Sequence, residues 1–420
     1  MVYNMSMPLM VLVCEYILML MFNKKTQNTI IDAFFLVVSP YVFIITINNL
    51  LMGGIGFYKV SNQVIWIHAI AIFFFFMGTF LGWHLGNNYK LKCYYKKTDL
   101  LSVNSVVLIF ISSISILIIL LDIYRLCAQY GIVGMLKQGD TVDRGYIASH
   151  LMILLTPLMI LMMDFYFETK KIIYILFCTI MLSLIFLTFI KYHIISAVLS
   201  IFIYVVLTRP QYVKKIGISS LVFVLGAFAL NYMINFKVNK MQVNDNFYIN
   251  HMWKYIAGGT INFSNVSNYV VKGQELSLLE WLFSMVLSFP AMILSRFLGV
   301  VFNRYHYSTL LPLFFVGMEK LEEQSNVVSL LGAAFAQTNA VSFLIFMFFW
   351  GILVQWIFRR AQKNVSIRSK LIASIFLAYN MLSFFSSFFE LSMPWETMVL
   401  AYLIFIPLNI RFARKKENRR

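Results

Sequence analysis

The sequence carries little charge for its length. Lys, Arg, Asp and Glu make up 12% of its 420 residues, whereas a soluble globular chain has about 25%. Apolar residues make up 60%, above the roughly 45–50% of soluble domains. This composition excludes a soluble enzyme and a disordered tail. It predicts an all-α integral membrane protein, because helices satisfy their own backbone polar groups in lipid.

Cysteine is scarce and known nucleotide and metal motifs are missing. The four cysteines, Cys14, Cys93, Cys127 and Cys178, form no CxxC pair, so neither a disulfide framework nor a zinc site is expected. Walker, Rossmann and HExxH motifs are absent. We therefore expect no metal and no cofactor. The first apolar stretch lacks a preceding basic residue and a cleavage site, which predicts a retained helix.

The excess of basic residues is explained by membrane orientation. The net charge is 34 − 17 = +17; in a soluble chain this would suggest nucleic-acid binding. In a membrane protein, Lys and Arg gather in cytoplasmic loops. No nucleic-acid partner is expected.

Eleven apolar runs are long enough to cross a bilayer. They lie near residues 7–22, 30–52, 63–85, 104–121, 146–166, 172–190, 192–208, 216–235, 338–358, 370–388 and 396–411. Alternate loops and the C-terminal tail hold 22 of the 34 basic residues. The positive-inside rule therefore predicts an N-terminus outside and a C-terminus inside.

One further apolar stretch, 278–303, is ambiguous because it contains Glu280, Pro290 and Arg296. If it crossed the membrane, the basic loop 359–370 would lie outside. We therefore predict a re-entrant or interfacial helical pair that is broken at Pro290.

The predicted topology divides the chain into three parts. These are an eight-span bundle at 1–235, a large external loop at 236–337, and a three-span bundle with a basic cytoplasmic tail at 338–420. No cytoplasmic segment is long enough to fold alone. Chemistry is therefore expected at the external face, where substrates must arrive already activated.

This arrangement resembles the O-antigen polymerase (Wzy-type) family of oligosaccharide repeat-unit polymerases. The resemblance rests on many short-looped spans, one large external loop and three closing spans. It also rests on the tight turn 188–193, the glycine-pair and aromatic stretch 255–263, and the loop exit 326–332 with Gly351 in the next span. The family often has an acidic residue where residues 336–339 read Ala-Gln-Thr-Asn here.

The resemblance implies a glycosyltransferase in the bacterial cytoplasmic membrane. Such enzymes transfer a growing glycan from undecaprenyl diphosphate onto a lipid-linked repeat unit. The energy lies in the glycosyl–phosphate bond, so no nucleotide sugar or metal is expected. The implied partners are the undecaprenyl-diphosphate-linked oligosaccharide, the bilayer, and flippase and chain-length regulator proteins. Capsule or other surface polysaccharides are possible products.

The proposed chemistry needs cations for the diphosphate. Three arginines are predicted at the external boundary: Arg144, Arg296 and Arg304. Each also has a structural interpretation. Arg144 could pair with Asp143, Arg296 with Glu280, and Arg304 could belong to an interfacial anchor.

A base must also accept the acceptor hydroxyl proton. His251 and Glu275 are the candidates, and solvated loop residues are the alternative. Further substrate contacts are predicted for Lys191, His193, Trp253, Tyr255 and His306. Helix capping, a small loop core or an aromatic belt are their alternative roles.

Three other functions stay open, and one of them is an O-acyltransferase, which would need an obvious catalytic histidine within a polar motif. A flippase or transporter of lipid-linked oligosaccharide would line a central cavity with charge. A ligase would use the same donor with another acceptor. Among residues inside the spans, His150 is interpreted as an interhelical hydrogen-bonding residue, and Asp32 and Asp164 are predicted to be interfacial.

Overall fold

A computed structural model of the chain describes most of its length. The described residues are 5–88, 104–138, 144–187, 191–239, 247–267, 276–286, 290, 293, 294, 297, 313–321, 324–364 and 366–408. Helices dominate this part of the chain. The strands in it are two residues long, β1 (Phe314–Phe315) and β2 (Gln324–Ser325), and they pair antiparallel. The prediction of an all-α protein is confirmed for the described residues.

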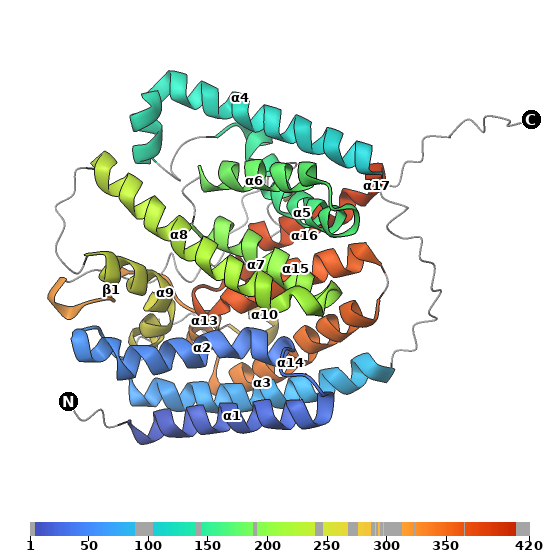
Figure 1. The fold of residues 1–420 in the computed structure, drawn as a ribbon. Coiled ribbons are helices and arrows are strands. Elements are labelled where there is room, and N and C mark those ends of the chain that lie inside the picture. Colours follow the sequence, from blue (N-terminus) through green and yellow to red (C-terminus); the bar gives the residue numbers. More distant parts are fainter. Residues whose placement is uncertain are drawn as a thin grey trace, which may run out of the picture. The chain divides into compact units, whose positions relative to one another are not determined.

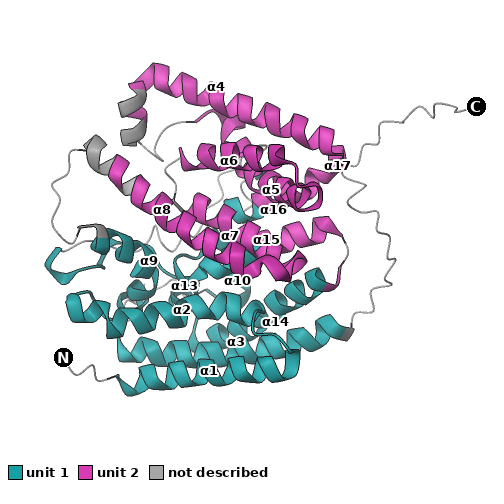
Figure 2. Ribbon diagram, in the orientation of Figure 1, with its two compact units in different colours: residues 1–90, 241–362, 376–395 teal, residues 91–240, 363–375, 396–420 magenta. Residues whose placement is uncertain are grey.

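The chain folds into two compact units, coloured separately in Figure 2. Unit 1 comprises residues 1–90, 241–362 and 376–395, and unit 2 comprises 91–240, 363–375 and 396–420. The units group residues by contact in space. The predicted divisions after residues 235 and 337 follow membrane topology instead, and they stay a prediction.

Unit 1 contains three N-terminal helices that lie side by side (Figure 1), namely α1 (Met7–Gln27), α2 (Ala33–Leu50) and α3 (Asn62–Asn88). A short 3₁₀ turn, η1 (Met52–Ile55), follows α2. Helix α14 (Ala340–Lys363) packs against α3 at very short range. A Cβ atom on Gly78 would lie 2.0 Å from the carbonyl oxygen of Phe348, and one on Gly351 would lie 2.3 Å from that of Phe75. Glycines therefore allow the two backbones to touch.

Buried hydrogen bonds join the ends of α1, α2 and α14. Asp32 caps α2 by accepting a backbone amide at 2.9 Å, and Asn23 donates to its other oxygen at 2.9 Å. Gln27 donates to Asn23 at 3.1 Å, and Gln355 donates to Gln27 at 3.3 Å. Gln355 in turn accepts the Ala33 amide at 3.2 Å. Asp32 is thus buried within the protein, and its predicted place at the membrane interface stays a prediction.

The described part of the predicted loop 236–337 is folded onto unit 1. It holds α9 (Phe247–Val266), α10 (Leu278–Val286), η5 (Glu319–Leu321) and α13 (Leu330–Gln337). Ser329 caps α13 by accepting the Gly332 amide at 3.2 Å. The side chain of Asn262 donates to the Ser325 and Val327 carbonyls at 3.0 and 2.8 Å. These bonds fix the segment before α13 against α9.

The predicted continuous span 370–388 is interrupted. Helix α15 (Ile367–Met381) ends early and gives way to the 3₁₀ turns η6 (Leu382–Phe384) and η7 (Phe388–Glu390), before α16 (Ser392–Leu403) begins. The Thr260 hydroxyl donates to the Phe384 carbonyl at 3.2 Å. A Cβ on Gly259 would lie 2.0 Å from the Phe385 carbonyl. Packing of α9 thus stabilises this irregular backbone.

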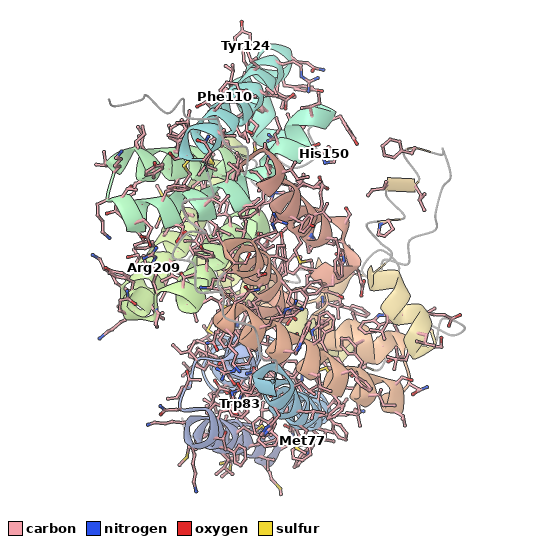
Figure 3. All side chains as sticks on the ribbon, turned by 90° about the vertical axis from the view of Figure 1, so that its right-hand side faces the viewer. Met77, Trp83, Phe110, Tyr124, His150 and Arg209 are labelled. Atoms are coloured by element: carbon pink, nitrogen blue, oxygen red, sulfur yellow. The ribbon has the colours of Figure 1, made fainter. Side chains whose placement is uncertain are left out.

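Unit 2 contains five complete long helices, parts of α15 and α16, and the short η4 (Pro210–Tyr212) and α17 (Phe405–Leu408). The long helices are α4 (Ser105–Gln138), α5 (Tyr146–Thr169), α6 (Ile172–Phe186), α7 (Lys191–Thr208) and α8 (Val213–Asn239). Consecutive helices pack together. Helix α4 continues well beyond the predicted 104–121, with a kink at Gly131, where φ is 69°. Phe110 and Tyr124 on α4 point outward (Figure 3), as expected for a lipid-facing helix.

Seven helices in the described residues are long and apolar enough to span a bilayer, and three shorter ones are also apolar. In α8 only 11% of the most apolar window is buried within the protein. These features support a membrane protein. Eleven crossings, the orientation and the external loop stay predictions.

Candidate functional site

Arg144 lies at the point in unit 2 where α5 begins and α6 ends. Its Nη2 donates to the carbonyl of Leu187, the C-cap residue of α6, at 3.4 Å. Burial lowers the pKa of the Arg144 guanidinium, and the negative charge of Asp122 opposes that effect. Arginine nevertheless stays protonated in proteins. A partly desolvated positive charge is therefore placed at this helix boundary.

Asp122 on α4 connects this boundary to a second arginine. Its Oδ1 accepts the Gly145 amide at 3.1 Å and Arg125 Nη2 at 2.9 Å. Its Oδ2 is buried, without a hydrogen-bond partner in the part of the chain that the structure describes. One carboxylate thus holds the start of α5 and interacts with the charges of both Arg125 and Arg144.

His193 lies in the first turn of α7 and interacts electrostatically with Arg144. The ring of Tyr192 meets that of His193 edge-on, with centroids 4.7 Å apart. Lys191 is the first residue of α7. Arg144 and the α7 start come from two separate predicted motifs, and the structure brings them together.

A His–carboxylate pair also lies at this end. His150 Nδ1 is hydrogen-bonded to the carboxylate of Glu396 on α16. The Tyr146 ring packs edge-on against His150 at 4.4 Å. Figure 3 labels His150 near the start of α5. This contact confirms the prediction that His150 bonds to another helix. We call the set of Asp122, Arg144, His150, His193 and Glu396 the Arg144 end of unit 2.

The charges at the Arg144 end suit an anionic ligand. The guanidinium groups of Arg125 and Arg144 face one carboxylate, Asp122, and Glu396 is already engaged by His150. A guanidinium offers a planar fork that matches two phosphate oxygens. Partial desolvation strengthens such contacts relative to bulk water. The arrangement can bind a phosphate or stabilise developing negative charge.

The predicted residues on α9 belong to unit 1, where they serve packing. Trp253 Nε1 donates to the buried Asn48 Oδ1 at 2.8 Å. The Tyr255 ring stacks on Phe385, with centroids 4.7 Å apart. His251 lies on the same helix. Asn48 and Phe385 lie outside the predicted loop 236–337, so these two contacts join α9 to other parts of unit 1 and do not form a separate core of the loop. Substrate contact by these residues stays a prediction.

Four predicted site residues lie outside the described residues. They are Glu275, Arg296, Arg304 and His306. The predicted positions of Arg296 and Arg304 at the external boundary therefore stay predictions, and so does the helix break at Pro290.

The opposite end of α5 holds a structural ion-pair network. Arg209, labelled in Figure 3, bonds to Asp164 at 3.1 Å and to the exposed Glu168. Its guanidinium also lies over the Phe167 ring at 5.2 Å. Asp164 is buried within the protein, and its predicted place at the membrane interface stays a prediction. These ion pairs join α5 to the turn between α7 and α8.

Sequence patterns identified Arg144 and His193 but not their surroundings. Asp122 directly follows an apolar run, and the sequence shows this. The sequence pattern does not predict which residues contact its carboxylate. Glu396 is 246 residues from His150. Such pairs become visible only once the helices are packed.

Comparisons with protein-family models, curated proteins and solved structures gave no match for this chain. Within the described residues, no group of three His, Cys, Asp or Glu side chains is arranged to hold a metal ion.

Proposed function

We propose that this chain is a membrane-bound polymerase that joins oligosaccharide repeat units carried on undecaprenyl diphosphate. The observation that carries the proposal is the partly buried Arg144 guanidinium at the ends of two apolar helices, beside Asp122 and His193. A diphosphate head attached to a hydrocarbon tail needs a cation at such a boundary. The apolar helices support a bilayer environment for the tail.

In the proposed reaction, a sugar hydroxyl of the acceptor attacks the anomeric carbon of the donor glycan. The bond between that carbon and the diphosphate breaks, and the diphosphate leaves with the electron pair. Arg144 stabilises the charge that develops on the leaving oxygen. The hydroxyl proton must pass to a base.

A second candidate function is favoured by the interrupted helix of unit 1. Between Met381 and Ser392 the backbone is irregular, and Ser383, Ser387 and Glu390 are buried there. The Ser387 hydroxyl donates to Glu390 at 2.7 Å. Discontinuous helices with polar groups commonly form substrate sites in transporters. A flippase of lipid-linked oligosaccharide is therefore the alternative, and it predicts a different cellular phenotype.

Deletion of the gene followed by glycolipid analysis tests these functions together. Loss of a polymerase should leave single repeat units on their carrier at the outer face of the membrane. Loss of a flippase should leave them at the inner face. Loss of a ligase should leave long polymer on the lipid carrier. Single units trapped inside, or polymer of normal length, would contradict the polymerase proposal.

A further inference from the structure

A long apolar groove lies within unit 2. It encloses about 870 Å³. Its lining residues recur at intervals of three and four, from Ile175 to Leu187 on α6 and from Ile216 to Leu230 on α8, so each helix presents one continuous face. Side chains of α5 and α7 complete the wall.

The groove is chemically suited to a hydrocarbon chain. The hydroxyls of Thr179 and Ser183 donate to carbonyls of their own helix at 3.0 and 2.9 Å, which leaves their apolar atoms to the groove. Gly226 also lines it, and a Cβ built there meets no heavy atom within 4 Å. The missing side chain at Gly226 thus keeps part of the groove open.

The groove follows most of the predicted span 172–190. The α6 face from Ile175 to Leu187 covers twelve residue steps, or about 18 Å at 1.5 Å per residue. In the predicted topology Ile175 lies near the cytoplasmic end of this span and Leu187 near its external end. A chain lying along this face would therefore extend from the external headgroup level through more than half of a hydrocarbon core that is about 30 Å thick.

A cation lies close to one end of the groove. Leu187 lines the groove, and its carbonyl accepts a hydrogen bond from Arg144 at 3.4 Å, although Arg144 is not itself a lining residue. An apolar groove with a partly buried guanidinium near one end matches a lipid with one long chain and an anionic phosphate head.

We infer that the groove between α6 and α8 holds the hydrocarbon chain of a polyprenyl phosphate lipid whose phosphate contacts Arg144. The choice of a polyprenyl chain over a diacyl lipid rests on the proposed function. The groove and its cation stand on the geometry of unit 2 alone. Gly226 and Arg144 then act on different parts of one ligand, which makes them separately testable.

The test uses the full chain in nanodiscs and a photoreactive polyprenyl monophosphate, with capture measured as a function of probe concentration. Gly226→Leu should weaken capture about tenfold, because the leucine displaces methylene groups of the bound chain. A Cβ at Gly226 meets no heavy atom within 4 Å, so the added side chain starts in open space. Ala229→Leu is the matched control, since Ala229 lies on the same helix outside the groove lining, and it should capture the probe normally.

The headgroup arm compares Arg144→Gln with the intact protein. This variant should capture the polyprenyl phosphate about tenfold more weakly. It should capture a photoreactive polyprenol, which has no phosphate, as well as the intact protein does. Normal capture by Gly226→Leu would overturn the inference. So would displacement of the probe by an equal concentration of phosphatidylglycerol, which would show an ordinary bilayer lipid in the groove.

The two proposals can fail separately. If the probe binds as described but the protein elongates no glycan, the groove stands and the polymerase proposal fails. If the intact protein and Gly226→Leu elongate glycan equally well, the polymerase proposal stands and the groove is not the carrier site.

Discussion

At the residue scale, Arg144 combines partial burial, a carbonyl contact and two charged or titratable neighbours, Asp122 and His193. Removing a donor that stabilises developing charge costs about 2.7–4 kcal/mol, or a factor of about 10²–10³ in rate. Arg144→Lys keeps the charge but loses the planar fork. We expect it to lower the rate of glycan elongation by about that factor while the protein still reaches the membrane in normal amounts.

Polymer length and membrane abundance, measured together, check this expectation. Arg360→Lys is the control, because Arg360 lies near the end of α14 in unit 1 and its guanidinium packs over the Trp356 ring. It should leave elongation unchanged. Normal polymer from Arg144→Lys would remove Arg144 from the reaction, and low abundance of the variant would assign it a structural role.

Asp32 makes the stability of unit 1 depend on pH. Burial raises the pKa of its carboxyl group from 3.8 to about 7, despite opposing backbone hydrogen bonds and the charge of Arg359. Between these two values the folded state holds a proton that the unfolded state has lost. Raising the pH through this window therefore lowers the free energy of unfolding, by roughly 2–4 kcal/mol in total.

Thermal unfolding at about pH 5 and about pH 8 measures this dependence. The intact protein should unfold at a lower temperature at the higher pH. In Asp32→Asn, which does not titrate, the difference between the two unfolding temperatures should shrink clearly. An equal difference in both proteins would assign the pH dependence to other groups.

The sequence predicted single residues where a charged residue stands next to an apolar run. Arg144 next to an apolar helix is such a case. The sequence did not indicate partners that are remote along the chain. Gln355 of α14 bonds to Ala33, next to Asp32, and Arg209 in the α7–α8 turn pairs with Asp164.

At the scale of elements, the contact between α3 and α14 depends on its glycines. A Cβ on Gly78 would lie 2.0 Å from the Phe348 carbonyl, so Gly78→Ala must push the two backbones apart. Overpacking of this kind typically costs about 1–3 kcal/mol. We expect a lower unfolding temperature for Gly78→Ala in detergent.

Gly226→Ala is the matched control for this variant. Both positions are glycines within long apolar helices, but a Cβ at Gly226 meets open space. It should unfold at or slightly above the temperature of the intact protein, since alanine favours helix. Equal unfolding temperatures for the two variants would mean that α3 and α14 do not touch at Gly78.

Helix positions were largely predictable from apolar runs, and helix ends less so. Each predicted span has a counterpart, as α5 and α14 illustrate. The run 370–388 is mostly apolar, yet the helix stops at Met381. After it, Thr260 donates to the Phe384 carbonyl, and the missing side chain of Gly259 leaves room for the Phe385 carbonyl. Such tertiary contacts override local preference, and a single apolar pattern does not encode them.

At the scale of the whole molecule, the predicted orientation can be tested with single cysteines in a background lacking the four native ones. Lys25 and Glu319 are both exposed. Basic residues such as Lys25 are predicted inside, and Glu319 is predicted outside. An impermeant thiol reagent should label Glu319→Cys in intact cells and should label Lys25→Cys only after the membrane is opened. The reverse pattern would invert the topology.

The two compact units each combine early and late parts of the chain. Composition and charge predicted a helical membrane protein but gave no indication of this grouping, because it depends on contacts between remote residues. The Arg144 end lies wholly within unit 2. The residues proposed to bind the phosphate at this end therefore all come from unit 2.

The most direct test of the proposed function is glycan elongation by the purified protein in a defined membrane. The substrate is an undecaprenyl-diphosphate-linked repeat unit, supplied with a chelator and without sugar nucleotide, and the products are separated by size. We predict a ladder of glycans that are multiples of the repeat unit, with release of undecaprenyl diphosphate. Repeat units that stay single in the presence of active, folded protein would contradict the polymerase proposal.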